Sequence, residues 1–179
     1  MTTLSPEAAR ALARHNGELS LNGLTSLSDE AGVALAKHSG GRLYLKGVKS
    51  LSTEVVKALA QRKGGGPTHK ICLDGLESLT VEAAEVLAEM HPHNWDGRLP
   101  GFKTVPLDVA KALAKRPGGL SLEGLTSLSD EAAKALQGRL NGYLPRLTAL
   151  TVESARSIAG PVPGQFHRTL NLDGLTALP

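Results

Sequence analysis

Short segments of this chain alternate apolar and polar residues, and one such pattern recurs along its whole length. The stretch from Leu19 to Leu24 reads Leu-Ser-Leu-Asn-Gly-Leu, and almost the same residues return from Leu120 to Leu125. A hydrophobic period of two is typical of a short strand with one buried face. We therefore expect the two leucines of each segment to lie inside the protein and the side chain between them to face outward.

A helix is predicted after each alternating segment. A hydroxyl residue is followed two positions later by an acid, which suits a helix start: the hydroxyl can accept a bond from a free amide, and the acid interacts favourably with the helix dipole. The residues that follow are mostly alanine with one larger apolar residue, which lets a helix lie close to a sheet. One start keeps the acid Asp108 but has Pro106 in place of the hydroxyl. The hydroxyl and acid pairs are Ser5/Glu7, Ser28/Glu30, Ser52/Glu54, Thr80/Glu82, Ser129/Glu131 and Thr151/Glu153.

The strand and helix pattern repeats with a period in the twenties. Equivalent positions fall at Gly23, Gly47, Gly75, Gly101, Gly124, Arg146 and Gly174, with separations of 24, 28, 26, 23, 22 and 28 residues. Units of a repetitive chain pack only against their neighbours. We therefore expect a single elongated domain over residues 1–179, with six full repeats between a half-repeat helix and a half-repeat strand.

The sequence resembles the leucine-rich repeat proteins. It is most similar to bacterial members built of Leu-x-Leu-x-Gly-Leu-x-x-Leu-Ser-x-Glu-Ala-x-x-Ala-Leu-Ala units. The resemblance implies an α/β fold, a right-handed solenoid with a parallel β-sheet on its concave face and short α-helices on its convex face. It also implies that the concave face binds other macromolecules.

The chain departs from the best-known form of the family at one position of the turn. That form has an asparagine whose side chain ties neighbouring turns together. Because an apolar side chain cannot bond to the backbone, we expect these turns to be held by backbone bonds or by hydroxyls such as Thr25, Ser26 and Ser127. The apolar residues at this position are Leu24, Val48, Leu76, Phe102, Leu125, Leu147 and Leu175.

Composition narrows the classes of function. Apolar residues make up 41% of the chain and aromatic residues only 3%, so the core has to be built from Leu, Ala and Val. The net charge of +3 comes with no dense basic patch and gives no support for nucleic-acid binding. Cys72 stands alone and can form no internal disulfide. The sequence as written shows no signal peptide, transmembrane span or cofactor motif, so we expect a cytoplasmic protein with neither membrane partner nor cofactor.

The candidate binding residues are the predicted outward side chains of the strand segments. They vary while the framework repeats, and they include tyrosine and arginine, which are enriched at binding hot spots. The alternative is a solvated face on which nothing constrains the residues. The predicted ligand-binding residues are Tyr44, Lys46, Cys72, Asp74, Arg98, Glu123, Tyr143, Asn171 and Asp173, and Ser20, Asn22, Pro100, Ser121 and Pro145 occupy equivalent places.

Trp95 lies in one of the longer predicted loops. An aromatic residue there either plugs the edge of the core or anchors a partner. We keep its loop as an accessory binding element.

Basic residues recur at two further positions. His91 and His93 with Asp96 invite a metal interpretation, but no acid or cysteine cluster completes a coordination set. A cation at the end of a helix, stabilised by the dipole, explains the recurrence of His15, His38, His91, Arg62 and Arg116 without a metal. The second recurring position lies within the predicted helices. Its residues form a basic stripe that is either a solvated face or a surface for an acidic partner: Arg10, Lys57, Lys111, Lys134 and Arg156.

The sequence favours a non-catalytic module that binds a protein or peptide through the concave sheet. No acid, base and nucleophile converge in a recognisable motif, so we do not expect an enzyme. The alternative is a structural protein that assembles end to end, pairing a helix at one end with a strand at the other.

Overall fold

The structure is a computed structural model that describes residues 3–62, 69–160 and 169–176. Two features of the longer predicted loops, the glycine run 64–66 and the aromatic residue Phe166, lie outside these residues. The described residues form an α/β protein with seven helices and a small parallel sheet, so the predicted fold class is confirmed at this level. The elements in order are α1 (Pro6–Leu12), β1 (Leu19–Ser20), α2 (Asp29–Leu35), β2 (Leu43–Tyr44), α3 (Thr53–Ala60), β3 (Ile71–Cys72), α4 (Val81–Glu89), α5 (Leu107–Ala114), α6 (Asp130–Ala135) and α7 (Val152–Ala159).

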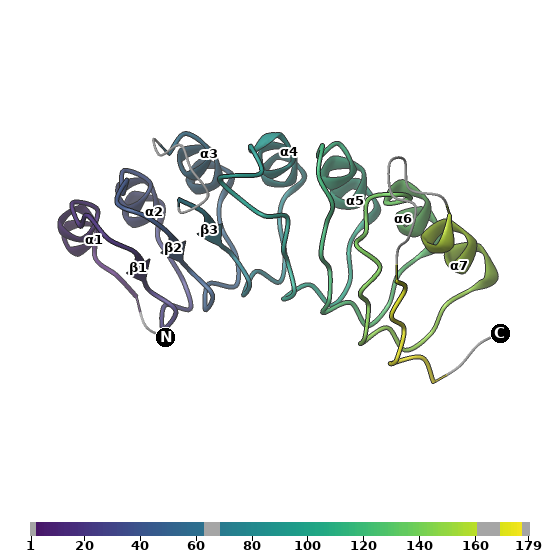
Figure 1. The fold of residues 1–179 in the computed structure, drawn as a ribbon. Coiled ribbons are helices and arrows are strands. Elements are labelled where there is room, and N and C mark those ends of the chain that lie inside the picture. The colour runs from purple at the N-terminus through teal and green to yellow at the C-terminus, as the bar shows by residue number, and fades with distance from the viewer. Residues whose placement is uncertain (1–2, 63–68, 161–168, 177–179) are drawn as a thin grey trace.

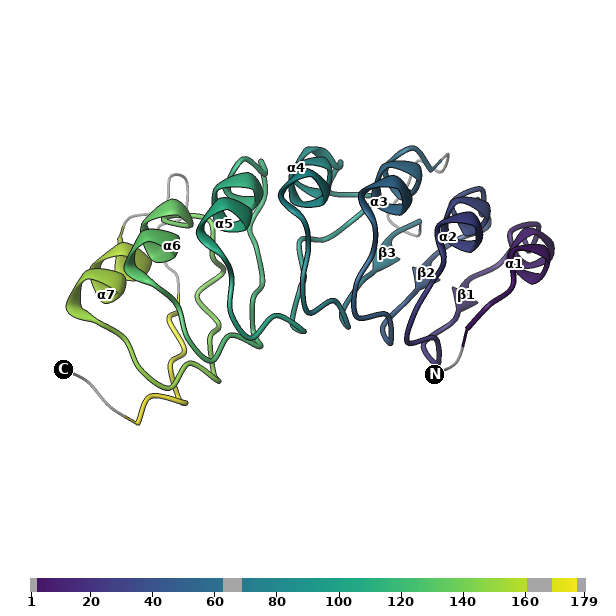
Figure 2. The same cartoon turned by 180° about the vertical axis from the view of Figure 1, so that it is seen from behind.

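The helices lie side by side in chain order along one side of the molecule (Figure 1). The short strands and the turns that follow them run along the other side, and the view from behind shows the same arrangement (Figure 2). The main helix contacts are between successive helices, from α1 with α2 to α6 with α7. Helices α1 and α7 therefore lie at opposite ends of the row.

The sheet is parallel, in the order β1-β2-β3, and its register follows the repeat. Leu19 pairs with Leu43 and Leu43 with Ile71, while Tyr44 lies between Ser20 and Cys72. Later units are joined only by single bridges within the described residues, so the regular sheet is shorter than predicted. These bridges are Ile71 to Trp95, Arg98 to Ser121, Leu120 to Leu140 and Tyr143 to Asn171.

Two of the later strand segments are each interrupted by a pair of inserted residues. The segments 95–100 and 140–145 share the pattern apolar-Asx-Gly-x-Leu-Pro. In each, the glycine has a positive φ, +81° at Gly97 and +82° at Gly142, which a side chain would oppose. The Asx side chain accepts the N–H two residues on, at 3.2 and 3.1 Å. These bulges break the ladder and explain the shortened sheet.

The predicted helix starts are confirmed. All six hydroxyl residues accept a hydrogen bond from the amide three positions later, at 3.0 to 3.3 Å. Helix α5 begins after Pro106 without a side-chain cap. A capping bond of this kind stabilises a helix by about 1 kcal/mol, which is large for helices of six to nine residues.

The core is aliphatic, as predicted, and lies between the strands and the helices. The inward strand residues Leu43, Leu45, Leu120 and Leu122 are fully buried, so the assignment of the paired leucines to the interior is confirmed. Helix alanines such as Ala83 face them and permit close approach.

The turns are held by backbone bonds, as expected from the missing asparagine. In all seven turns, the N–H of the apolar residue donates to the carbonyl three residues earlier, as from Leu24 to Leu21 at 3.0 Å. At these turns, the hydroxyls of Thr126, Thr148 and Thr176 join units by donating to the carbonyls of Lys103, Thr126 and Thr148 respectively. Threonine therefore takes part, but not at the residues named from the sequence.

Candidate functional site

The candidate site is the outward surface of the extended segments, here named the strand face. It comprises the predicted ligand-binding residues together with Ser20, Asn22, Pro100, Ser121 and Pro145. Tyr143 is 46% exposed, and Tyr44 and Cys72 are half-buried, so these side chains lie on the outside as the alternation requires. Parallel register brings residues more than twenty positions apart in the sequence next to each other on this surface.

Tyr44 is held by contacts with the preceding unit and with its own. Its hydroxyl donates to Glu18 Oε2 at 3.3 Å, and the Lys46 ammonium lies 5.8 Å from its ring centroid. Lys46 in turn pairs with Asp74 at 3.2 Å. The phenol ring is therefore positioned before any partner arrives.

Side chains in the second half of the strand face are also held by ion pairs and hydrogen bonds. Arg98 pairs with Glu123 at 3.3 Å, and Asn171 donates to Asp173 at 2.8 Å. The Ser121 hydroxyl donates to Glu123 at 2.7 Å. Ser121 is only 7% exposed, so the prediction that it faces solvent is wrong: it supports Glu123 from beneath.

Cys72 is not an activated thiol. Burial raises its pKa above the ordinary value, and the carboxylates of Asp74 and Asp96 raise it further. A thiol with a raised pKa stays protonated at neutral pH and is a poor nucleophile. On this surface, Cys72 is a small, weakly polar contact residue.

The position of Trp95 contradicts the accessory binding role predicted for it. Its side chain is fully buried, so it cannot meet a partner from its loop as an accessory binding residue. The indole occupies the place of the first inward leucine of its unit, which Gly97 cannot fill. The Arg116 guanidinium lies 4.7 Å from the ring centroid and donates to the Trp95 carbonyl at 2.8 Å. The Asp96-Gly97 dipeptide was the available signal, because it marks a turn that displaces the strand.

His38 and Arg62 form a buried connection between units. Burial lowers the pKa of His38, and the Gly17 carbonyl only partly opposes this, so the ring is neutral rather than a cation at a helix end. Arg62 can only donate, so His38 Nδ1 accepts its bond at 3.1 Å. His38 Nε2 then carries the proton and donates to Gly17 O at 2.9 Å. The dipole explanation is wrong for His38 and incomplete for Arg62.

The other histidines of the described residues form no metal centre. The rings of His91 and His93 lie 4.8 Å apart on an exposed loop. Across the described residues, no group of three His, Cys, Asp or Glu side chains could hold an ion.

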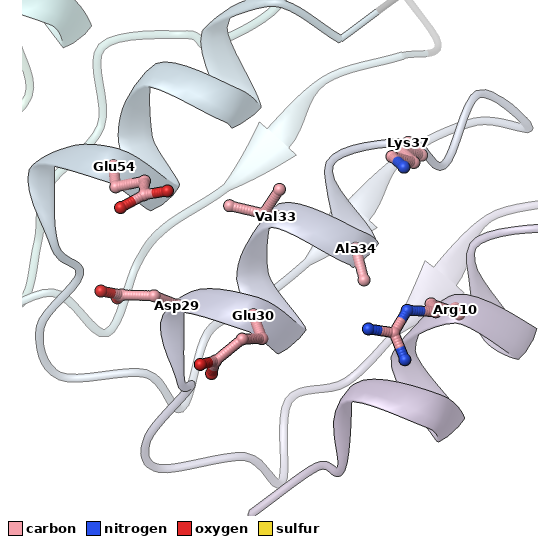
Figure 3. A pocket seen from close by; sticks show the side chains of 7 residues that line it. All are labelled: Arg10, Asp29, Glu30, Val33, Ala34, Lys37 and Glu54. Atoms are coloured by element: carbon pink, nitrogen blue, oxygen red, sulfur yellow. The ribbon is translucent and has the colours of Figure 1, made fainter.

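The helix side of the molecule carries open hollows, and two of them are lined mainly by charged residues. One of about 420 Å³ lies between the first three helices, with its carboxylates on one side and its basic groups on the other (Figure 3). The predicted basic stripe is largely neutralised, because Arg10, Lys111 and Arg156 each pair with the acid three residues before. The hollow is lined by Arg10, Asp29, Glu30, Val33, Ala34, Lys37 and Glu54.

Comparison with known proteins gives no family assignment. No family model matches the chain, and no curated protein sequence matches it at a significant level. None of the helices in the described segments has the length and apolar character needed to cross a membrane.

Proposed function

We propose that this protein is a right-handed leucine-rich repeat solenoid that binds a protein or peptide partner through its strand face, without catalysis. The repeated register, the parallel strands and the contacts between successive helices support the solenoid. In this proposal the strand face is concave and the helices are convex. Such a shape offers an extended surface rather than a pocket.

The observation that carries the binding proposal is the contrast between the two sides of each strand. The inward residues are a constant set of buried apolar side chains, while the outward residues change from unit to unit. Tyr44, Arg98 and Tyr143 are of the types that dominate binding energy. Because neighbouring units already hold Tyr44 and Arg98, less side-chain entropy is lost when a partner binds.

The polar groups of the strand face suit recognition rather than chemistry. The carboxylates of Asp74 and Glu123 are engaged in ion pairs, and the Cys72 thiol is protonated. The two carboxylates can exchange their present ion-pair partners for charged groups of a ligand at small cost. The proposal therefore includes no catalytic step.

Selection of peptides from a random display library tests this function. We expect selected peptides to bind the triple variant Tyr44→Ala, Arg98→Ala, Tyr143→Ala at least tenfold more weakly than the parent. The triple variant Lys57→Ala, Lys111→Ala, Lys134→Ala on the helix side should bind within twofold of the parent. Circular dichroism checks that both variants are folded. Equal affinity of the first triple variant and the parent would overturn the proposal.

A second candidate is end-to-end assembly. Leu170, Leu172 and Leu175 are only partly buried, whereas Leu43, Leu45 and Val48 at the equivalent positions are fully buried. Another copy could cover this apolar edge. Sedimentation over a concentration series tests this, because assembly requires a mass that rises with concentration and a constant monomer mass would exclude it.

A further inference from the structure

The charged residues of the strand side are arranged in rows that cross the strands. One row consists of the residue before the first inward residue of a unit, whose carbonyl accepts an N–H from the preceding unit. These bonds are Leu19 N to Arg42 O at 2.8 Å, Leu43 N to Lys70 O at 3.0 Å, Ile71 N to Asn94 O at 2.8 Å and Leu120 N to Arg139 O at 2.7 Å. Arg42, Lys70 and Arg139 are here named the basic row; Glu18 is the one acid at this position, and Asn94, Gly119 and Thr169 are uncharged.

Acids gather four residues further along, on the other side of the strand face. Asp74, Glu123 and Asp173 follow the second inward residue of their units, and we name them the acidic row. Lys46 is the one basic residue at this position, and Asn22, Pro100 and Pro145 are uncharged. Between the two rows, the central residues include Tyr44, Cys72 and Tyr143, and the charges there are those of Arg98 and of the exposed Asp96 two residues before it.

The spacing of these rows fits an α-helix. In units without inserted residues, as from Lys70 to Asp74, four residues of strand separate the rows by about 13 Å, close to the roughly 10–12 Å diameter of a helix with its side chains. Neighbouring strands lie about 4.8 Å apart, close to the 5.4 Å pitch of a helix. A helix that crosses the strands would therefore present about one turn to each unit.

We infer that the strand face recognises an α-helix of a partner protein that is acidic along one flank and basic along the other. The acidic flank lies over the basic row, the basic flank lies over the acidic row, and Tyr44 and Tyr143 contact the middle of the helix. This inference rests on the proposed function, because it specifies the partner of the same surface.

The charges of both rows are only weakly engaged by the protein itself. Arg42, Lys70 and Arg139 are half-buried and make no ion pair within 4 Å in the described part of the chain, and Arg42 lies near Tyr44 and Glu18, both of which raise its pKa. The Asp74 and Glu123 carboxylates are in ion pairs with Lys46 and Arg98, whose side chains are 45% and 48% exposed. Ion pairs at this exposure contribute about 0–1 kcal/mol, so a partner can replace them.

Defined peptides test the inference by fluorescence anisotropy. The probe is a labelled helical peptide of about 20 residues, enough to cross six strand spacings, with glutamates along one flank and lysines along the other. The control has the same composition with the charges mixed around the helix. Exchange of the flanks is no control, since that peptide can bind in the reversed direction. We expect the segregated peptide to bind at least tenfold more tightly than the mixed one.

Charge reversal locates the contact on the protein. Arg42→Glu with Lys70→Glu should weaken binding of the segregated peptide about tenfold or more, the sum of two surface pairs replaced by repulsion. Lys57→Glu with Lys111→Glu makes the same change in net charge on the helix side and should change binding less than twofold. Circular dichroism and urea unfolding check that both variants fold.

Three results would overturn the inference. They are equal binding of the mixed peptide, equal binding of the segregated sequence with its helix broken by central prolines, and no binding of any designed peptide. The proposed function fails separately, if peptides selected from a library ignore the substitution of Tyr44, Arg98 and Tyr143. Selected peptides that respond to those substitutions while the designed helix does not bind would leave the binding face intact and remove only the helical partner.

Discussion

Replacement of Arg62 by methionine tests whether buried cations connect the repeat units. Arg62 is 8% exposed and lies just beyond α3. Its guanidinium donates to the carbonyls of His38 and Gly41, both at 3.0 Å, to the His69 carbonyl at 3.3 Å and to His38 Nδ1 at 3.1 Å. Methionine keeps much of the apolar stem and removes every donor.

The expected cost follows from the acceptors left behind. A buried acceptor without a partner costs about 1–3 kcal/mol, and Arg62 serves two buried carbonyls and the His38 ring. Burial of the charge itself is unfavourable, which lowers the net loss. We therefore expect the free energy of unfolding to fall by about 2–4 kcal/mol. Lysine cannot reproduce the fork of donors, so Arg62→Lys should lose a smaller but measurable amount.

Urea unfolding followed by circular dichroism measures this loss. The matched control is Lys57→Met, which makes a similar change at an exposed position of helix α3 and should stay within about 0.5 kcal/mol. If Arg62→Met unfolds at the same urea concentration as the control, the buried bonds do not connect the units.

Three further predictions concern backbone, pH and the strand ladder. Gly97→Ala should lower the free energy of unfolding by about 2 kcal/mol or more, because φ is +81° and the new Cβ would meet Gly119 O and lie 2.9 Å from Arg116 Nε. The control is Gly23→Ala, whose new Cβ meets nothing within 4 Å and which should have little effect. Urea unfolding of both variants compares them. Burial lowers the pKa of His38 below its ordinary value of 6.5, so its contribution to stability is full above that pH and is lost as the pH falls toward the folded-state pKa; urea midpoints at pH 7.5 and 5.5 should differ less for His38→Gln than for the parent. Thr148→Val removes the bond from its hydroxyl to Thr126 O at 3.1 Å and should cost at most about 1 kcal/mol, and a calorimetric scan that shows no loss would assign no stability to this ladder.

The local structure was predictable from the sequence because local chemistry determines it. A Ser or Thr before an acid identified six helix starts, and each hydroxyl caps its helix in the structure. Alternation identified which strand residues are buried. Both signals act within a few residues, where one sequence suffices.

The contacts between units were not predictable in the same way. Arg62 and Arg116 recur at a helix end, which suggested a dipole effect, but their donors reach carbonyls of the preceding unit. The period alone does not show which backbone groups are left unpaired by a loop. Only the fold reveals that these carbonyls lie buried beside the guanidinium groups.

The strand bulges were missed because the alignment treated all units alike. Asp96-Gly97 and Asn141-Gly142 are turn dipeptides, and each lies two residues before the second inward leucine. Had they been recognised, Trp95 would have been placed in the core as the substitute for a leucine. Local turn chemistry there takes precedence over the repeat period.

Binding through the strand face is tested most directly by a map of backbone amide shift changes when a library-selected peptide is added to the labelled protein. We predict that the largest changes fall in the strand segments 42–46, 70–74, 96–100, 121–123 and 141–145. These segments are given in the order in which they cross the strand face. Changes confined to the helices α1 to α7, with the strand segments unaffected, would contradict the assignment of binding to the strand face.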